Sequence, residues 1–378
     1  IKLLLHCKQH VPAYAGLLPD DSVILTDPMA VLRTRIPLLP KTNFQQNPEA
    51  YLADDIPASA RIANCTGGST GQPVHFYMTR HQVESYEAAR WRGLSWYGIT
   101  QGSRSVMLWG SPIELSKQAQ LKNRLKESLL KNRRILSAYN LTEQDLTKHV
   151  RFLEHYKPEY LYGYATILTA FAQMLENAHI TPNLSLKAVV STSETLEKWQ
   201  EELLSRVFRC SVANEYGARD AGILAYTCPE GGIHITAENC VIEVLDPVTH
   251  EPVPDGTSGI LAITDLTNYV QPRLRYMLGD MGTLSTEECC CGGRLPLVPI
   301  IEKELLQRRE EQMQNQKLYR KSYDTNYLDF VFVNDMGTLF KPDYITRHFK
   351  ELLQRNNLKV IRVHDLRHPY VKHTTKNF

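Results

Sequence analysis

The sequence predicts an α/β fold in its first part, a β-rich module after it and a mainly helical segment at its end. Short apolar runs such as 104–109 and 187–191 alternate with longer amphipathic stretches, which is the pattern of alternating strands and helices. From residue 222 the apolar runs become shorter, and turns such as 254–256 separate them. We therefore divide the chain into the regions 1–221, 222–293 and 294–378.

Composition points to an ordinary globular protein. The chain has 378 residues with 43% hydrophobic and 22% charged residues, and its net charge of +2 carries no signature of nucleic-acid or membrane binding. No apolar run is long enough to span a bilayer, and no signal-peptide core follows the first residues. Three consecutive cysteines, 289–291, are poor geometry for a secreted disulfide framework. We expect a cytoplasmic protein whose natural start lies upstream, because the chain begins without Met.

Local signals place the elements along the chain. Thr79 is a candidate N-cap for a helix over 81–97, and the Thr-Glu-Gln-Asp run at 142–145 is a capping signature for a helix that ends at 156. Ligands of α/β folds usually bind in the loops at strand ends. The other expected helices are 118–137, 165–178, 196–208, 302–317 and 343–355, and the other expected strands are 160–163, 234–235, 240–245, 259–264 and 330–333.

The stretch 64–73 is the most informative for chemistry. Its glycines let the backbone turn so that several N–H groups point at one place, and its hydroxyls add further donors. Such a loop is a cradle for phosphate oxygens, but of a different class from the common nucleoside-triphosphate loop, because Gln72 and Pro73 follow where Lys would stand. The alternative is a mobile polar linker. The glycines are Gly67, Gly68 and Gly71, and the hydroxyl residues are Thr66, Ser69 and Thr70.

Three further segments carry residues suited to a nucleotide site. Ser193 and Glu194 lie just after the strand 187–191, separated from it by Thr192. Tyr216 could stack on a purine beside Gly217, and Asp220 could hold a magnesium ion. Asp280 ends a Gly-Asp turn, where its carboxylate could accept hydrogen bonds from ribose hydroxyls. A turn or cap role for each aspartate and simple packing for the Tyr-Gly pair are the plain structural alternatives.

In this order, the four segments resemble the adenylate-forming enzymes, in particular the phenylacetate–CoA ligase-like branch, which includes proteins of capsular polysaccharide synthesis. The resemblance covers about residues 1–293. It implies that a carboxylate attacks the α-phosphate of ATP to give an acyl adenylate and pyrophosphate, and that coenzyme A then displaces AMP. The segments that carry it are 66–73, 193–194, 216–220 and 275–280.

The resemblance also implies a role for each residue. The loop with Thr66, Ser69 and Thr70 would hold the β- and γ-phosphates. Tyr216 and Gly217 would contact adenine, with Ser193 and Glu194 also at the nucleotide. Asp220 would serve Mg²⁺, where the family commonly has Glu, and Asp280 would bind the ribose. Tyr162, Gly163 and Tyr164 resemble a segment near the acyl pocket.

The resemblance stops short of the family's last part. The family normally adds a hinge and a small C-terminal domain, which brings a lysine to the α-phosphate, and neither is recognisable here. We therefore expect adenylation much slower than in an intact relative, because that lysine stabilises charge in the transition state. The implied partners are a small carboxylic acid, ATP and coenzyme A, with no membrane partner, and a homodimer is compatible with the resemblance.

Cysteine and histidine spacing predicts a zinc site. Cys228 and His234 flank a turn, and the run 289–291 supplies further thiols. Three thiolates and one imidazole suit tetrahedral zinc. Relatives with a Cys, His and Cys-x-Cys set imply a structural Zn²⁺ ion, and Cys290 is a rival ligand. Four ordinary reduced residues are the alternative. The implied ligands are Cys228, His234, Cys289 and Cys291.

The segment 294–378 resembles part of the catalytic domain of tyrosine recombinases. The resemblance rests on 294–299, 330–333 and 341–346, followed by the box 364–368. It implies that His364 and Arg367 once held a scissile phosphate. The upstream catalytic arginine and lysine have no counterpart, and Tyr370 is too close to the box to be the nucleophile. We interpret the segment as a truncated fragment and expect no DNA binding by it.

Activation of a carboxylic acid with ATP is thus the predicted function, and two alternatives stay open. In one, the tail and the basic stretch 117–134 form a DNA-binding or integration-related module, although a solvated helix face explains the basic run more simply. In the other, the chain is an inactive fusion. DNA binding would weaken steeply with salt, nucleotide binding would depend on magnesium, and the inactive fusion would show neither.

Overall fold

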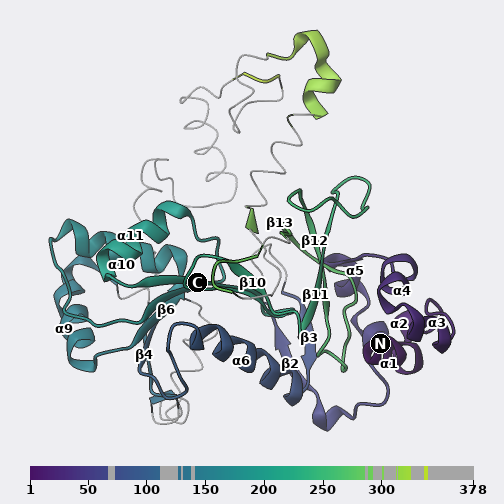
Figure 1. Ribbon diagram of the computed structural model, residues 1–378, viewed down its shortest axis with the longest axis horizontal. Coiled ribbons are helices and arrows are strands. Elements are labelled where there is room, and N and C mark those ends of the chain that lie inside the picture. The colour runs from purple at the N-terminus through teal and green to yellow at the C-terminus, as the bar shows by residue number, and fades with distance from the viewer. Residues whose placement is uncertain are drawn as a thin grey trace, which may run out of the picture. The chain divides into compact units, whose positions relative to one another are not determined.

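The structure is a computed structural model in which the chain forms two compact units, Ile1–Ile301 and Glu302–Phe378 (Figure 1). Each unit is described by itself. The structure describes residues 1–66, 73–110, 127–128, 131–137, 141–285, 288–292, 300–301, 312, 314–324 and 336–338.

A seven-stranded sheet forms the centre of the first unit, which confirms the predicted α/β fold. Its strand order is β10-β9-β8-β7-β6-β4-β5. The strands from β5 to β8 run parallel, and β9 and β10 continue the sheet in antiparallel fashion. The boundary that the sequence suggests near residue 222 therefore falls between two neighbouring strands of one sheet. The strands are β4 (Ser105–Trp109), β5 (Arg133–Ser137), β6 (Tyr160–Tyr164), β7 (Ala188–Thr192), β8 (Ser211–Ala218), β9 (Gly222–Thr227) and β10 (Ile233–Ile235).

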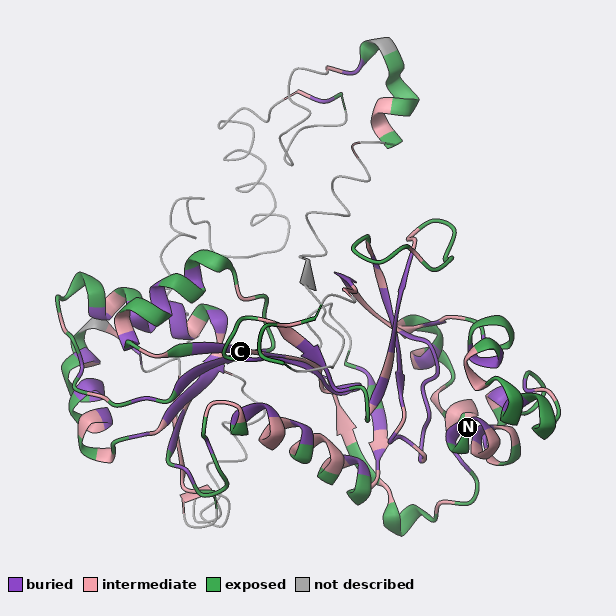
Figure 2. Cartoon of the chain, in the orientation of Figure 1, coloured by how far each residue is buried: buried purple, intermediate pink, exposed green. Residues whose placement is uncertain are grey.

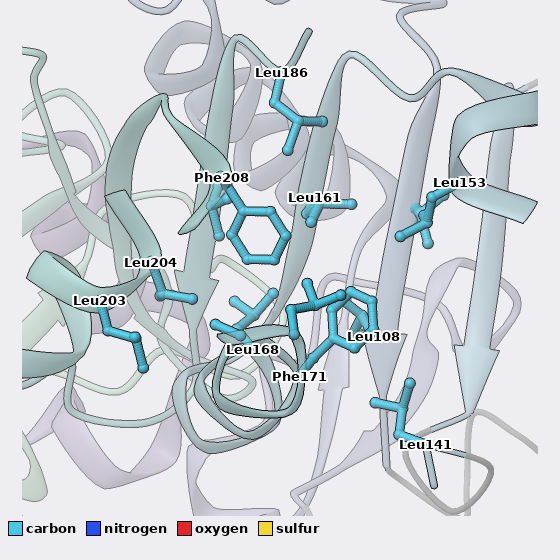
Figure 3. Packing of buried hydrophobic residues seen from close by; sticks show 14 of the residues in the cluster. Leu108, Leu141, Leu153, Leu161, Leu168, Phe171, Leu186, Leu203, Leu204 and Phe208 are labelled. Carbon is cyan, nitrogen blue, oxygen red and sulfur yellow. The ribbon is translucent and has the colours of Figure 1, made fainter. Parts of the chain in front are cut away.

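Helices cover both faces of this sheet. On one face, α9 (Leu146–Tyr156), α10 (Ala165–Asn177) and α11 (Lys198–Phe208) pack on Leu108 and Leu161 (Figure 3). On the other face, α6 (Arg80–Ser95) packs over Trp109 and Tyr162. Successive side chains of a strand point to opposite faces, so Leu161 enters the helix-covered core while its neighbour Tyr162 faces α6. The strands are largely buried, and green outer faces mark the helices as exposed (Figure 2).

A second sheet has the order β1-β13-β12-β11, with β14 also paired to β13. Its main strands are antiparallel, whereas β1 joins β13 in parallel. A separate hairpin of two strands, β2 and β3, flanks the segment 67–72. The strands are β1 (Leu39–Pro40), β2 (Ile62–Cys65), β3 (His75–Met78), β11 (Cys240–Leu245), β12 (Ser258–Asp265), β13 (Tyr276–Thr283) and β14 (Ile300–Ile301).

Short helices at the start of the chain pack around a core of their own. Leu4 and Cys7 of the first helix lie in one buried cluster with Leu274 and Ala53. This cluster connects the N-terminal helices to the segment that leads into β13. The helices are α1 (Lys2–His10), α2 (Pro12–Ala15), α3 (Asp21–Thr26), α4 (Pro28–Arg35) and α5 (Lys41–Gln46). Over the described residues the 3-10 turns are η1 (Pro48–Tyr51), η2 (Ala58–Ala60), η5 (Glu143–Asp145) and η6 (Arg320–Ser322).

The helix start predicted at Thr79 is confirmed, whereas α9 begins after Asp145, whose side chain makes no capping hydrogen bond. Thr79 Oγ1 accepts a hydrogen bond from the Gln82 N–H at 3.3 Å and caps α6. Thr142 Oγ1 accepts from the Asp145 N–H at 3.2 Å, in the turn before α9. The Thr79 side chain thus supplies an acceptor for an N–H group that the helix leaves unpaired, whereas the Asp145 N–H also donates to the Thr142 backbone oxygen at 3.1 Å.

The helix expected over 118–137 is wrong at its C-terminal end. Arg133–Ser137 is strand β5, paired in parallel with β4 at the edge of the sheet. Ile135 packs on the α6 side, and the next residue, Leu136, packs on the side of α9 to α11. Sheet pairing with a distant strand overrides a local pattern that suits a helix. Residues 118–126 lie outside the described part of the chain.

The second unit is described only in short stretches. Residues 312 and 314–319 are helical, so the described helix overlaps the one expected over 302–317 and continues two residues past it before η6. The expected strand 330–333 and helix 343–355, together with His364 and Arg367, lie outside the described residues. Over the described residues, no helix combines the length and the apolar composition that a membrane crossing needs.

Candidate functional site

A cavity of about 510 Å³ lies on the α6 side of the central sheet. Trp109, Tyr162 and Thr192, at or near the carboxyl ends of β4, β6 and β7, line it. Asn64 of β2 also lines it, three residues before the glycine segment 67–72. The carboxyl ends of parallel strands are the usual place for a ligand in an α/β fold, so this cavity is the candidate active site.

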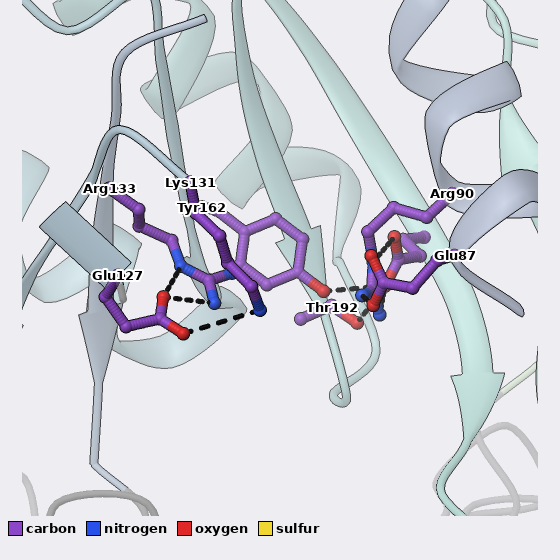
Figure 4. Close-up of polar contacts among 8 residues, drawn as sticks. Glu87, Arg90, Glu127, Lys131, Arg133, Tyr162 and Thr192 are labelled. Carbon is purple, nitrogen blue, oxygen red and sulfur yellow. Dashed lines mark hydrogen bonds and ion pairs between the residues drawn. The ribbon is translucent and has the colours of Figure 1, made fainter. Parts of the chain in front are cut away.

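A buried polar network forms one wall of the cavity (Figure 4). The Glu215 carboxylate on β8 accepts hydrogen bonds from Tyr162 Oη at 2.6 Å, Thr192 Oγ1 at 3.3 Å and Arg90 Nε at 3.0 Å. Arg90 also pairs with Glu87 at 2.8 Å. Burial raises the pKa of Tyr162, so its phenol stays a neutral donor. Three donors hold the Glu215 charge in place and fix the Tyr162 ring at the cavity surface.

Aromatic and basic side chains continue the lining of the cavity from Tyr162. Trp109 stacks on Tyr162 with ring centroids 6.0 Å apart and also contacts Tyr164 at 4.2 Å. Arg133 of the edge strand β5 donates from Nε to Glu127 at 2.6 Å, and both residues line the cavity. The cavity therefore presents both aromatic and charged side chains, a combination that suits a small molecule with polar groups.

The glycine loop is described only at its base. The Thr66 N–H donates to Val74 O at 3.0 Å, and the Val74 N–H donates to Thr66 Oγ1 at 2.9 Å. Thr66 therefore closes the two strands of the hairpin on which the loop stands. Gly67, Gly68, Ser69, Thr70 and Gly71, which the sequence assigns to phosphate binding, lie outside the described residues.

Ser193 and Glu194 are adjacent but have different surroundings. Ser193 lines the cavity with a left-handed backbone, φ +66°. The Glu194 carboxylate accepts from the N–H and the hydroxyl of Thr166, at 2.8 and 2.7 Å, in the first turn of α10. Negative charge is favourable at a helix N-terminus, so Glu194 has a structural role as a cap in this structure.

Tyr216 and Asp280 lie together although they are far apart in the chain. Tyr216 Oη donates to Asp280 Oδ2 at 2.9 Å, and burial raises the pKa of Tyr216. Gly217 lines the cavity next to them, and a Cβ at Gly217 would meet the backbone oxygen of Gly222 at 2.4 Å. The close approach of β9 therefore requires this glycine, independently of any ligand.

Asp220 is enclosed by other parts of the fold. Its carboxylate accepts from Tyr276 Oη at 2.9 Å, and its backbone oxygen accepts from Arg273 Nη2 at 2.6 Å. Only 3% of Asp220 and 1% of Arg273 are exposed. Burial, followed by the charge of Asp220, raises the pKa of Tyr276. In this structure Asp220 holds β13 against the turn between β8 and β9, and its magnesium role stays a prediction.

The structure brings the four predicted zinc ligands together. The ligand atoms of Cys228, His234, Cys289 and Cys291 lie within 4.8 Å of one another. Cys228 Sγ is 3.7 Å from Cys289 Sγ, and Cys291 Sγ is 3.3 Å from His234 Nε2. The rival, Cys290, is exposed, and its Sγ lies 4.0 Å from the Glu230 carboxylate. This geometry separates Cys290 from its neighbours, which the sequence alone leaves open.

The thiols of this cluster have shifted pKa values. Hydrogen bonding by the Cys291 backbone N–H lowers the pKa of Cys289 to about 6, and burial raises the pKa of Cys228 to about 11. In the absence of metal, Cys289 is thus more readily deprotonated than Cys228. Three sulfurs and one imidazole nitrogen at these separations fit a tetrahedral zinc ion.

Sequence reasoning missed Glu215 and Arg90 as residues of the site. Glu215 stands directly before Tyr216, in a segment that the sequence does single out, and it points to the other face of β8. Arg90 lies on α6 and pairs with Glu215 over 125 positions of the chain. No local signal in the sequence connects the two residues.

Comparisons with known proteins agree with this fold. No protein-family model matches the chain. The chain is 24% identical over 253 residues to protein CapK of Staphylococcus aureus, covering 67% of the chain and 54% of CapK. It is 26% identical over 310 residues to phenylacetate–coenzyme A ligase of Thermus thermophilus, covering 77% of the chain and 65% of that ligase. The chain thus spans between about half and two thirds of these curated relatives' length.

Solved structures show the same likeness. The structure resembles 2-hydroxyisobutyryl-CoA ligase in its postadenylation state with a TM-score of 0.65 at 19% identity, covering 80% of this chain and 65% of that one. An open conformation of the same ligase gives a TM-score of 0.64 at 17% identity, covering 85% and 79%. The chain is therefore similar in sequence to phenylacetate–coenzyme A ligase and CapK, and its first unit shares the fold of 2-hydroxyisobutyryl-CoA ligase.

The network around Glu215 makes a prediction about stability. We expect Glu215→Gln to lower the free energy of unfolding by about 3 kcal/mol in a denaturant titration, because it leaves the Arg90 guanidinium without its buried counter-charge. As a control, Glu176→Gln breaks the exposed pair with Arg206 and should change stability by no more than about 0.5 kcal/mol. Equal effects of the two substitutions would contradict the importance of the buried pair.

Proposed function

We propose that this chain binds ATP and activates a small carboxylic acid as an acyl adenylate for transfer to coenzyme A. The observation that carries the proposal is the position of the cavity. It lies at the carboxyl ends of the parallel strands and is bordered by β2, which leads into the glycine segment, and by Ser193 and Gly217. Three of the four segments that resemble adenylate-forming enzymes thus border, or lead into, one cavity.

The relatives support the same chemistry. The ligase of Thermus thermophilus acts, by its name, on phenylacetate and coenzyme A, and 2-hydroxyisobutyryl-CoA ligase is seen with an acyl adenylate and coenzyme A. In this reaction a carboxylate oxygen forms a bond to the α-phosphorus of ATP, and pyrophosphate leaves. The thiol sulfur then forms a bond to the acyl carbon, and AMP leaves with the bonding electron pair.

Different residues of the chain would bind the phosphates and the acyl group. The backbone N–H groups of the glycine segment and the hydroxyls of Ser69 and Thr70 would hold the β- and γ-phosphates. Trp109 and Tyr162 would bound the acyl group, which favours an acid with a compact apolar or aromatic body. Magnesium would neutralise phosphate charge. Asp220 is enclosed against Tyr276, so no step here depends on an ion at Asp220.

Calorimetry with ATP and Mg²⁺ tests the proposal. We expect saturable binding with a dissociation constant between about 1 μM and 1 mM, and a loss of at least tenfold in affinity for the variant Ser69→Ala/Thr70→Ala, because it removes two phosphate donors. Ser22→Ala, at an exposed serine on α3, is the control and should bind like the unchanged chain. A folded chain that binds no ATP, or a double variant that binds equally well, would overturn the nucleotide site.

We propose further that Cys228, His234, Cys289 and Cys291 hold a structural Zn²⁺ ion. The support is the S₃N donor set and the separation of its atoms. Bound there, zinc would connect the turn between β9 and β10 to the segment 288–292, with no open position for catalysis.

Metal analysis of the purified protein tests the zinc site. We expect Cys289→Ser to contain one zinc ion per chain less than the unchanged protein. Cys290→Ser should contain as much zinc as the unchanged protein, because the Cys290 thiol lies outside the cluster. The two variants differ by one position and make the same chemical change. If both lose zinc, or neither does, the assignment of these ligands is wrong.

The recombinase-like interpretation of 294–378 stays a prediction, because His364 and Arg367 lie outside the described residues. We propose only that the box 364–368 marks a recombinase-like segment.

A further inference from the structure

A second cluster of metal-type side chains lies among the N-terminal helices. His6 and His10 are one helical turn apart on α1, so they project from the same face of the helix. Asp55 reaches them from the segment between η1 and η2. The ligand atoms of these three residues lie within 4.8 Å of one another. None of them borders the cavity described above.

The hydrogen bond of His6 shows which of its nitrogens is free. Nε2 lies 2.8 Å from the backbone oxygen of Tyr269, and a carbonyl only accepts, so Nε2 carries the hydrogen and donates it. In the neutral ring Nδ1 then carries a lone pair. That nitrogen lies 3.7 Å from Asp55 Oδ2.

His10 has the complementary arrangement. Its Nδ1 lies 2.9 Å from Asp54 Oδ1, and a carboxylate accepts, so Nδ1 donates. The lone pair of the neutral ring is therefore on Nε2, which lies 4.0 Å from Asp55 Oδ2. Both histidines thus direct an unprotonated nitrogen toward the same carboxylate oxygen.

Three electron-pair donors that face one another suit a cation held between them. Separations of 3.7 and 4.0 Å are too long for hydrogen bonds. Ligands at about 2.0–2.2 Å from a tetrahedral ion stand roughly 3.3–3.6 Å apart. A contraction of a few tenths of an ångström, within reach of small side-chain rotations, would bring each of these histidine nitrogens and Asp55 Oδ2 to the separation of two ligands of one ion.

We propose that His6, His10 and Asp55 form a binding site for a divalent first-row transition-metal ion, with zinc as the first choice. Two imidazoles and one carboxylate suit Zn²⁺, Co²⁺ and Ni²⁺, whereas Mg²⁺ and Ca²⁺ prefer oxygen ligands. The site also has its supporting shell, because metal-bound histidines usually donate their other N–H to a carbonyl or a carboxylate. Here those acceptors are Tyr269 O and Asp54.

The site is open to solvent on one side. The side chains of His6, His10 and Asp55 are 12%, 34% and 37% exposed. An ion can therefore enter without unfolding of the chain, and three protein ligands leave a position for water. Bound metal would join α1 to the segment at Asp55 and, through the His6 hydrogen bond, to the turn at Tyr269. It would thus fasten the N-terminal helix to the rest of its unit.

Cobalt titration of the full chain followed by visible absorption tests this proposal. Thiolate-bound cobalt gives an additional sulfur-to-metal charge-transfer band, so the two clusters differ in their spectra. We expect one equivalent of cobalt to bind without that band. The substitutions His10→Gln and Asp55→Asn should each raise its dissociation constant at least tenfold, because each removes one of three ligands.

The control is His155→Gln, at an exposed histidine on α9, which should leave the titration unchanged. Thermal melting of the metal-free variants shows that they fold, and zinc should raise the melting temperature of the unchanged chain more than that of His10→Gln. Two results would overturn the proposal. One is cobalt binding only with the thiolate band. The other is equal affinity in folded His10→Gln and the unchanged chain.

Discussion

The alternation of side chains along the central strands is the constraint on which the rest of the structure depends. In β6, Leu161 enters the core under α10, while Tyr162 faces the cavity. In β8, Val212 joins that same core, and Glu215 lies on the cavity face. A shift of one residue in the register would move Glu215 into the apolar core and remove Tyr162 from the site. Because side chains alternate along each strand, the sheet places an apolar core on one face and a polar, ligand-sized cavity on the other.

The charged groups on the cavity side need compensation within the fold. Glu215 is almost fully buried, and it is held by hydrogen bonds from Tyr162, Thr192 and Arg90. An apolar wall would be at least as stable, because desolvation of two charges offsets most of their attraction. Retaining such a network is typical of a site in which a functional group must be positioned rather than of a purely structural core.

The sequence predicts those parts of the fold that local signals determine. The strands at 104–109 and 187–191 and the cap at Thr79 follow from bounded apolar runs and a side-chain acceptor. The strand Arg133–Ser137 does not, because only its pairing with β4 makes it a strand. Contacts between residues far apart in the sequence cannot be predicted from local signals either. The His6-x3-His10 spacing is plain in the sequence, but nothing local points to Asp55, and the Arg90–Glu215 pair likewise joins distant segments.

The central claim, that this chain forms acyl adenylates, is tested most directly by exchange of labelled pyrophosphate into ATP. The account predicts that label enters ATP only when Mg²⁺ and a carboxylic acid are both present, with small apolar and aromatic acids most effective. It also predicts that exchange falls in Ser69→Ala/Thr70→Ala. A folded chain that gives no exchange with any acid of a broad panel, or exchange that is independent of the acid, would contradict the account.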